Sequence, residues 1–198
     1  MERNNPRIIR NTVHGTEFIG LDEHFMSERK LFLLGDVTPE SATGLIKQVM
    51  YLQSLDRKEE ITLYIDSSGG NVISGLSLFD VLKSLKVPLK TVCIGQAASM
   101  AGILFLAGEK RIMLPHSRLM LHDPSYSHSS IDGLKAHEIK EMVTDLDKVG
   151  EELVMIIAEA TGHSFDEIKE VTCKDTYFSA VQALAFNLAT DITRNIGG

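Results

Sequence analysis

The chain has 198 residues, of which 43% are hydrophobic and 24% charged, and its formal net charge is −7. This length fits one domain, and the composition excludes a disordered, collagen-like or disulfide-scaffold protein. The acidic balance and the lack of a long Lys/Arg block disfavour nucleic-acid binding. Cys93 and Cys173 lack CxxC or metal-ligand spacing, so we expect reduced, buried thiols in a cytoplasmic protein and no metal site.

Neither a secretory signal nor a membrane span is expected. The amino-terminal residues have no apolar core behind them, which disfavours export. Residues 91–108 carry no charge and approach the length of a membrane span. Glycines, Gln96 and Ser99 interrupt this stretch, and its first third is β-branched. The pattern therefore favours a strand followed by a short buried helix.

Strands and helices alternate along the predicted chain. Residues 1–17 are expected to form a polar, irregular arm. Predicted strands cover residues 31–34, 61–66, 89–95, 112–114 and 119–122, and predicted helices cover 39–55, 72–86, 99–107 and 132–160. Two capping boxes, Ser164-x-x-Glu167 and Ser179-x-x-Gln182, start two more short helices. The alternation predicts an α/β fold with a parallel sheet in a single domain, residues 1–198.

The longest helical pattern, residues 132–160, follows a polar loop and ends before Gly162. Its apolar residues form one stripe, and a helix of this length extends ~45 Å, more than a small domain needs. Monomers rarely tolerate such an exposed stripe. We therefore expect the stripe to be buried against another surface.

Two segments, residues 66–70 and 95–102, place glycines and a hydroxyl between a strand and a helix. Backbone N–H groups at helix starts can bind an oxyanion, and Ser99 has the position of a nucleophile on a strand-to-helix turn. The segment does not match G-x-S-x-G. By spacing alone, a helix N-cap role for Ser99 is favoured over a nucleophile.

A serine nucleophile needs a base, usually histidine, and a group that orients the base. Five histidines lie in polar or helical contexts typical of solvent exposure: His14, His24, His128, His137 and His163. His122 differs, because it ends an apolar strand. A structural hydrogen bond from His122 to a carbonyl is the competing interpretation. Spacing leaves the acid open among Asp66, Asp123 and Asp175.

Four segments resemble the ClpP family, the proteolytic subunits of the caseinolytic (Clp) protease. They are LYIDSSGG (63–70), GQAASMAG (95–102), LPHSRLMLHDP (114–124) and DTYFSA (175–180). The resemblance runs from about residue 8 to residue 192. It implies the α/β ClpP/crotonase-like fold with repeated strand-strand-helix units, an axial arm at residues 1–17, and a protruding handle, the loop and helix of residues 123–161.

The resemblance also implies the site. Ser99 matches the family nucleophile, His122 the general base, and Asp175 the acid that orients His122. The backbone N–H groups of Gly70 and Met100 match the oxyanion hole. Neither metal nor cofactor is implied.

Family membership would further imply partners and assembly. Substrates would be unfolded polypeptides, fed by an AAA+ unfoldase of the ClpX, ClpA or ClpC type into a chamber between two heptameric rings. The subunit would be a cytoplasmic homo-oligomer, with no membrane or nucleic-acid partner. The family docks an unfoldase loop in an apolar groove, matched here by Tyr64, Val92, Ile112 and Leu114. Buried strand packing is the competing interpretation for these residues.

Three departures from the family pattern leave alternatives open. Ser68 stands at a usual proline, the loop after His122 lacks the usual glycines, and Cys173-Lys174 replaces an acid–Arg pair. A weakly active or regulatory ring subunit is therefore one alternative. An acyl-CoA enzyme of the crotonase fold is another, although such enzymes usually use carboxylates rather than a Ser/His/Asp set.

Overall fold

The computed structural model describes residues 6–13, 15–56, 58–126 and 133–196. Parts of two expected segments lie outside the described residues: residues 1–5 of the arm and residues 127–132 of the handle. The same holds for two of the histidines expected in solvent, His14 and His128. The strands are β1 (Arg7–Thr12), β2 (Gly15–Gly20), β3 (Lys30–Leu34), β4 (Ile61–Ser67), β5 (Leu89–Ala98), β6 (Lys110–Met113), β7 (Arg118–Leu121), β8 (Thr176–Ser179) and β9 (Asp191–Ile192). The helices are α1 (Leu21–Ser27), α2 (Pro39–Leu55), α3 (Val72–Ser84), α4 (Met100–Phe105), α5 (Ala136–Thr161), α6 (Phe165–Thr172) and α7 (Ala180–Ala185).

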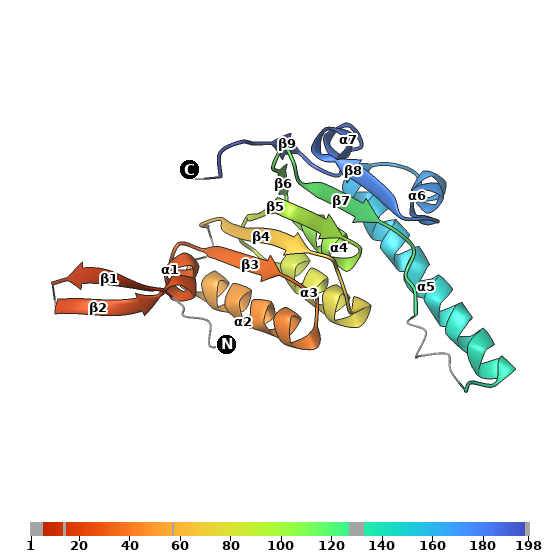
Figure 1. The fold of residues 1–198 in the computed structure, drawn as a ribbon, viewed down its shortest axis with the longest axis horizontal. Helices are drawn as coiled ribbons and strands as arrows, with labels where there is room; N and C mark the ends of the chain where they lie inside the picture. Colours follow the sequence, from red (N-terminus) through yellow and green to blue (C-terminus); the bar gives the residue numbers. More distant parts are fainter. Residues whose placement is uncertain (1–5, 14, 57, 127–132, 197–198) are drawn as a thin grey trace.

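A mostly parallel sheet forms the centre of the fold (Figure 1). Its strand order is β3-β4-β5-β6-β9, and all of these neighbours pair in parallel. The ten-residue strand β5 pairs with β6 through Lys90–Cys93 and with β7 through Gln96–Ala98. Strand β8 then adds to β7 in the antiparallel direction. The predicted α/β fold with a parallel sheet is confirmed.

Helices cover the sheet and supply the core. Figure 1 shows α2 and α3 lying together along strands β3 to β5. Every residue of α4 is buried, which explains the uncharged stretch at residues 91–108 as the strand β5 followed by a core helix. Within the described part of the chain, none of the helices combines the length and the hydrophobicity that a bilayer crossing requires.

Local signals fix the helix starts. At α2 the Thr38 side chain accepts a hydrogen bond from Ser41 N, and Pro39 occupies the first turn. Both predicted capping boxes are present, at the starts of α6 and α7. Gly162 ends α5 in the left-handed conformation at φ 79°, as its position predicted.

Some elements differ from the expectation. The segment expected to be irregular instead forms the antiparallel hairpin β1–β2, which extends away from the sheet in Figure 1. Gly15 permits its turn with φ 126°. Helix α5 begins at Ala136 rather than at residue 132, because Gly133 has φ 78° and breaks the helical path. Helix α1 and the short strands β8 and β9 were not predicted.

Among the described residues, burial on α5 is confined to the second half of the helix. Leu153, Val154 and Ile157 are buried there. In the first half, the apolar side chains of Ile139 and Val143 are 38% and 51% exposed. This half of α5 also lies beyond the sheet in Figure 1. The described residues therefore leave the predicted apolar stripe uncovered where the helix protrudes.

Arg111 on β6 ties the carboxyl-terminal elements to the sheet. Its guanidinium donates to four backbone carbonyls, at distances of 2.8–3.4 Å: Leu188, Asn187, Ala160 and Gly108. Burial lowers the pKa of Arg111. These bonds join the end of α5 and the segment before β9 to the edge of the sheet. They supply side-chain donors to four backbone carbonyls where regular secondary structure ends.

Replacing Arg111 with methionine should lower the free energy of unfolding by about 2–4 kcal/mol, because the aliphatic stem remains while the partly buried carbonyls lose their donors. Urea unfolding followed by circular dichroism measures the change. Arg118→Met, at an exposed residue of β7, is the matched control and should change stability little. Equal effects of the two substitutions would contradict the assignment.

Candidate active site

The parallel strands bring three segments to one edge of the sheet. The carboxyl ends of β4, β5 and β7 lie on the same side, because these strands run in the same direction. Gly69 follows β4, Ser99 follows β5 and His122 follows β7. Asp175 precedes β8, which runs antiparallel to β7 and therefore starts at that same edge. Residues separated by up to about half the chain thus meet through sheet topology alone.

Ser99 joins β5 to α4. Its backbone angles, φ 54° and ψ −126°, are rare for residues other than glycine. It occupies the N-cap position of α4, but its side chain makes no capping hydrogen bond. Instead, Ser99 Oγ lies 2.8 Å from His122 Nε2. Ser99 N–H donates to the Met120 carbonyl at 2.9 Å, which fixes the turn against β7. The hydroxyl is therefore directed at a histidine rather than at the helix.

His122 and Asp175 face each other because they continue the β7–β8 register. Leu121 pairs with Thr176, so the next opposed residues are His122 and Asp175. His122 Nδ1 lies 3.6 Å from Asp175 Oδ1, close enough for an ion pair and longer than a hydrogen bond. The His122 side chain is 23% exposed and the Asp175 side chain 61%. Ser99, His122 and Asp175, the candidate triad, thus form a continuous chain of contacts.

The backbone of Gly69 and Gly70 passes close to Ser99, and hydrogen bonds to Val37 hold it there. Gly69 accepts a hydrogen bond from Val37 N–H at 2.8 Å, and Asn71 N–H donates to the Val37 carbonyl at 2.8 Å. Gly69 and Gly70 have φ values of 94° and 145°. A Cβ atom at Gly69 would lie 2.7 Å from Ser99 Cβ and 2.9 Å from Met100 N. Sequence analysis did not single out Gly69, whose close approach only the folded chain reveals.

The two expected oxyanion donors, the N–H groups of Gly70 and Met100, lie in the two backbone segments that come close together beside Ser99. Met100 is the first residue of α4, so its N–H has no acceptor within the helix. Gly70 pairs with Val37 through hydrogen bonds of the flanking residues, which leaves the Gly70 N–H outside that bridge. Both N–H groups thus belong to segments that pack against Ser99. Their arrangement suits an oxyanion formed at a carbonyl attacked by Ser99.

In the part of the chain that the structure describes, the other two candidate acids, Asp66 and Asp123, form no ion pair with His122, and their hydrogen bonds serve the backbone. Asp66 Oδ1 accepts a hydrogen bond from Gln96 N–H at 3.0 Å, so this carboxylate supports the backbone between β4 and β5. Asp123 N–H donates to the Thr172 carbonyl at 2.7 Å, which joins the segment after β7 to the end of α6. Among the described residues, the acid paired with His122 is Asp175.

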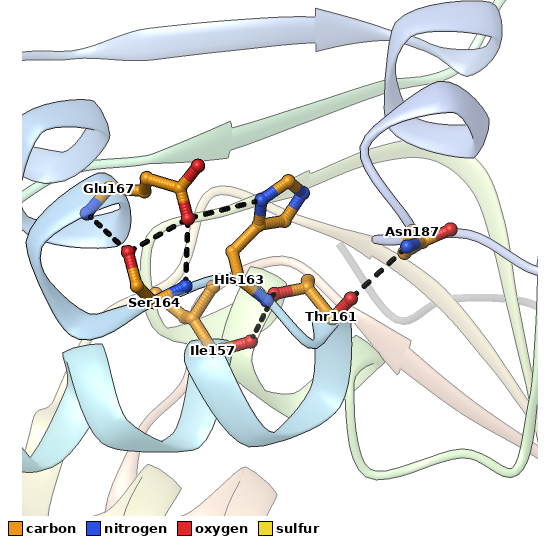
Figure 2. Close-up of polar contacts among 6 residues, drawn as sticks. All are labelled: Ile157, Thr161, His163, Ser164, Glu167 and Asn187. Carbon is orange, nitrogen blue, oxygen red and sulfur yellow. Dashed lines mark hydrogen bonds and ion pairs between the residues drawn. The ribbon is translucent and has the colours of Figure 1, made fainter.

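The segment that leads to Asp175 is anchored at the junction of α5 and α6 (Figure 2). Ser164 N–H donates to Glu167 Oε2 at 2.8 Å, and the bonds from the Ser164 backbone and hydroxyl lower the pKa of Glu167. His163 Nδ1 lies 3.7 Å from the same oxygen. The His163 ring stacks on Phe186 with centroids 4.0 Å apart. His163 was expected in solvent, but its side chain is only 28% exposed because Phe186 covers it.

Three of the four expected groove residues form one row across the sheet. Tyr64, Val92 and Ile112 are register partners on β4, β5 and β6, and they line a cavity of ≈ 210 Å³. Residues at the end of the chain complete this cavity, and Tyr64 Oη donates to the Ile196 carbonyl at 3.5 Å. Leu114 lines a separate cavity with Ile94 and Arg194. The structure therefore groups three of the four residues.

The cysteines differ from each other. Cys93 on β5 is buried, and burial raises its pKa to about 11. Cys173 is exposed, which contradicts the expectation that both thiols are buried, because the chain turns at the surface after α6. Within residues 6–13, 15–56, 58–126 and 133–196, no group of three His, Cys, Asp or Glu side chains could hold a metal ion.

Gly69→Ala should slow the reaction of Ser99 with a fluorophosphonate roughly a hundredfold, because the new Cβ would displace the glycine segment or Ser99 by a fraction of an ångström or more. Mass spectrometry of the labelled peptide measures the rate. Gly44→Ala in α2 is the matched control, since a Cβ there meets nothing within 4 Å. An unaffected Gly69→Ala protein would contradict the close packing.

A family model described as Clp protease matches residues 14–195. The match spans the two glycines after β4, the Ser99 turn, His122 and the segment before β8, so it covers all the segments that meet at this edge of the sheet. The resemblance noted from short motifs thus extends over nearly the whole chain. The protein belongs to the Clp protease family of serine proteases.

Proposed function

We propose that the protein is a ClpP-type serine endopeptidase in which Ser99 is the nucleophile. One observation carries the proposal most strongly: Ser99 Oγ lies 2.8 Å from His122 Nε2 while its backbone is held at φ 54°. A structural N-cap serine would adopt ordinary extended angles and bond to its own helix. Backbone strain of this kind is concentrated at reacting groups.

In the proposed reaction, Ser99 Oγ attacks the peptide carbonyl carbon while His122 Nε2 accepts the hydroxyl proton. The same proton passes to the leaving amine as the C–N bond breaks, which leaves an acyl ester on Ser99. His122 then removes a proton from water while the water oxygen attacks the acyl carbon. As the bond from that carbon to Ser99 Oγ breaks, His122 returns the proton to Ser99 Oγ, which releases the carboxylic acid product. Asp175 holds the His122 ring with Nδ1 protonated and Nε2 free to accept.

The oxyanion forms on the carbonyl oxygen, where the N–H groups of Gly70 and Met100 would donate to it. Both belong to backbone fixed before substrate arrives, so little reorganisation is needed. Loss of one such donor costs about 3 kcal/mol of barrier in comparable sites. Ser68, at the family's usual proline, donates from its hydroxyl to Asp36 Oδ1 at 2.8 Å. This bond offers a substitute restraint on the glycine segment.

The exposure of Asp175 and its distance from His122 support a role for subunit assembly in catalysis. Its side chain is 61% exposed and 3.6 Å from His122 Nδ1, so the last contact of the candidate triad is loose in the isolated chain. We propose that contact with the opposite ring, next to Cys173-Lys174, brings Asp175 closer to His122. The same looseness favours the alternative of a weakly active or regulatory ring subunit.

The proposed particle is a homo-oligomer of heptameric rings, with residues 1–198 acting as one peptidase domain. Rings require two different surfaces on each subunit, whereas face-to-face stacking requires a self-complementary one. The protruding half of α5 in the handle, residues 123–161, supports the stacking contact through Ile139 and Val143. Exposed Met50, Tyr51 and Leu55 on α2 support a separate contact within a ring. The arm at residues 1–17 would then lie near the ring axis.

Unfolded polypeptides would be delivered by an AAA+ unfoldase, whose hydrophobic loop would dock on Tyr64, Val92 and Ile112. Their cavity supports this assignment, because Tyr64, Val92 and Ile112 give it apolar contacts beside the charged Lys90 and Asp191. Tyr64 and Val92 are only 7% and 3% exposed, so the loop would contact mainly Ile112 and the edge of the Tyr64 ring. Leu114 would extend the groove toward its neighbouring cavity.

Ser99→Ala should abolish fluorophosphonate labelling and peptide hydrolysis while leaving folding intact. Asp175→Asn should reduce hydrolysis roughly a thousandfold or more, because His122 would lose the carboxylate that favours its tautomer with Nδ1 protonated. Asp123→Asn is the matched control and should have a much smaller effect, since its backbone rather than its carboxylate joins Thr172. Residual activity of Ser99→Ala within threefold of wild type would contradict the nucleophile. An Asp123→Asn defect larger than that of Asp175→Asn would contradict the acid.

Tyr64→Ala should abolish unfoldase-driven degradation of a folded substrate while cleavage of small peptides survives, because the groove lies away from the candidate triad. Parallel assays of both substrates measure the separation. Equal loss of both activities would instead indicate that the Tyr64 ring, which stacks on Phe32 with centroids 5.1 Å apart, serves core packing.

Sedimentation at micromolar concentration should show a tetradecamer, with a separated heptamer as the competing species. Burial of the apolar stripe on the first half of α5, which includes Ile139 and Val143, is the physical reason for the larger particle. Val143→Glu, which places a charge on that stripe, should shift the particle toward single rings. A stable monomer or dimer of the wild-type chain would contradict the assembly.

A further inference from the structure

The carboxyl-terminal end of α6 lies beside the point where β7 ends and β8 begins (Figure 1). The last carbonyl groups of a helix find no N–H donor within it, so they accept hydrogen bonds from neighbouring elements. The carbonyl of Thr172, the last residue of α6, accepts from Asp123 N–H at 2.7 Å. Asp123 directly follows His122, so this bond ties the His122 side of the candidate triad to the end of the helix.

Thr176 makes the corresponding bond on the Asp175 side, and it does so with its side chain. Thr176 Oγ1 donates to the carbonyl of Val171, the next to last residue of α6, at 2.7 Å. The same hydroxyl lies 3.3 Å from the Lys174 carbonyl, which belongs to the peptide bond that precedes Asp175. One hydroxyl thus contacts both the end of α6 and the peptide bond that leads into Asp175.

The register of β7 and β8 explains why Thr176 reaches α6 while Asp175 does not. Successive side chains of a strand point to opposite faces of the sheet. Thr176 pairs with the buried Leu121 and lies on the same face of β8 as the buried Phe178. Asp175 continues this alternation toward the other face, where its side chain is 61% exposed. Little packing holds that side chain, so its direction depends on the backbone that the Thr176 hydroxyl restrains.

We propose that Thr176 is a positioning residue of the candidate triad: its hydroxyl, bonded to the end of α6, holds Asp175 in the orientation that faces His122. This inference rests on the proposed function, because it requires Asp175 to orient the base of a Ser99 protease. Without the hydroxyl, the Val171 carbonyl loses its donor and residues 173–175 lose a restraint. Asp175 would then lie beside His122 Nδ1 for a smaller fraction of the time, and the base would be less well oriented.

The test compares Thr176→Val, which keeps the shape of the side chain and removes the hydroxyl, with Thr176→Ser, which keeps the hydroxyl. Hydrolysis of a short unstructured peptide by the assembled full chain, measured over a range of peptide concentrations, separates kcat from KM. Thr176→Val should lower kcat about tenfold with KM unchanged, because the hydroxyl faces α6 and not the substrate. Thr176→Ser should keep kcat within about twofold of the wild type.

Thr91→Val is the matched control. Thr91 Oγ1 on β5 donates to the carbonyl of Phe105, the last residue of α4, also at 2.7 Å. The substitution therefore removes the same kind of strand-to-helix bond at a place away from Asp175. Because Thr91 is fully buried, Thr91→Val should lower the melting temperature at least as much as Thr176→Val does, while leaving kcat unchanged. If Thr176→Val fails to assemble, Thr176→Ala replaces it, since alanine removes the hydroxyl without placing a methyl group beside the Val171 carbonyl.

A double-mutant cycle with Asp175→Asn tests whether Thr176 acts through Asp175. The measurement is the rate at which a fluorophosphonate labels Ser99, followed by mass spectrometry of the labelled peptide. In the wild-type background, Thr176→Val should slow labelling about tenfold. In the Asp175→Asn background, the same substitution should slow labelling less than about twofold, because the group that it positions is already gone.

The possible outcomes separate this inference from the proposed function. An unchanged kcat in Thr176→Val overturns the positioning role alone, and so does an equal loss of kcat in Thr176→Ser or in Thr91→Val. A full loss from Thr176→Val beside Asp175→Asn overturns it as well. A wild-type protein whose Ser99 is not labelled overturns the proposed function and this inference together.

Discussion

Strand β5 is the element on which the rest of the structure depends. It is long enough to pair with β6 along its first half and with β7 along its second half, while β4 pairs along its other edge. This exchange of partners moves β7 beside the Ser99 turn, which places His122 within 2.8 Å of the hydroxyl. Without the second half of β5, the histidine strand would have no parallel neighbour at the site edge. One strand's length thus accounts for the contact between Ser99 and His122.

Close packing of backbone, rather than long side chains, defines the site. The glycines after β4 lie so close to Ser99 and Val37 that no side chain fits at either position. The positive φ at Ser99 and the extended glycine segment are both costly in isolation, and they are held by hydrogen bonds to β7 and to Val37. Asp175 is the exception, since its position depends on the short β7–β8 ladder and its side chain is mostly exposed.

The sequence predicted the parts of the fold that local rules control. Helix starts with capping boxes, the left-handed Gly162 and the buried helix after β5 all follow from residue type and spacing. The hairpin β1–β2 and strand β8 escaped prediction because their stability comes from pairing with distant or weakly patterned segments. In the site, spacing could not show which of the three aspartates lies beside His122, because the register of β7 and β8 determines it. The exposure of Cys173 likewise depends on where the chain turns after α6.

The two cysteines differ in exposure, so a dye that reacts with thiols would label the chain at one natural position. Cys93 is buried with its pKa raised to about 11, so at neutral pH it stays a thiol shielded from reagents. Cys173 is exposed, and it lies two residues before Asp175. A maleimide dye would therefore attach at one place in the separated chain without any engineered residue. Its fluorescence would report the environment of the segment that carries Asp175, and a change on adding unlabelled chain would show whether copies associate there.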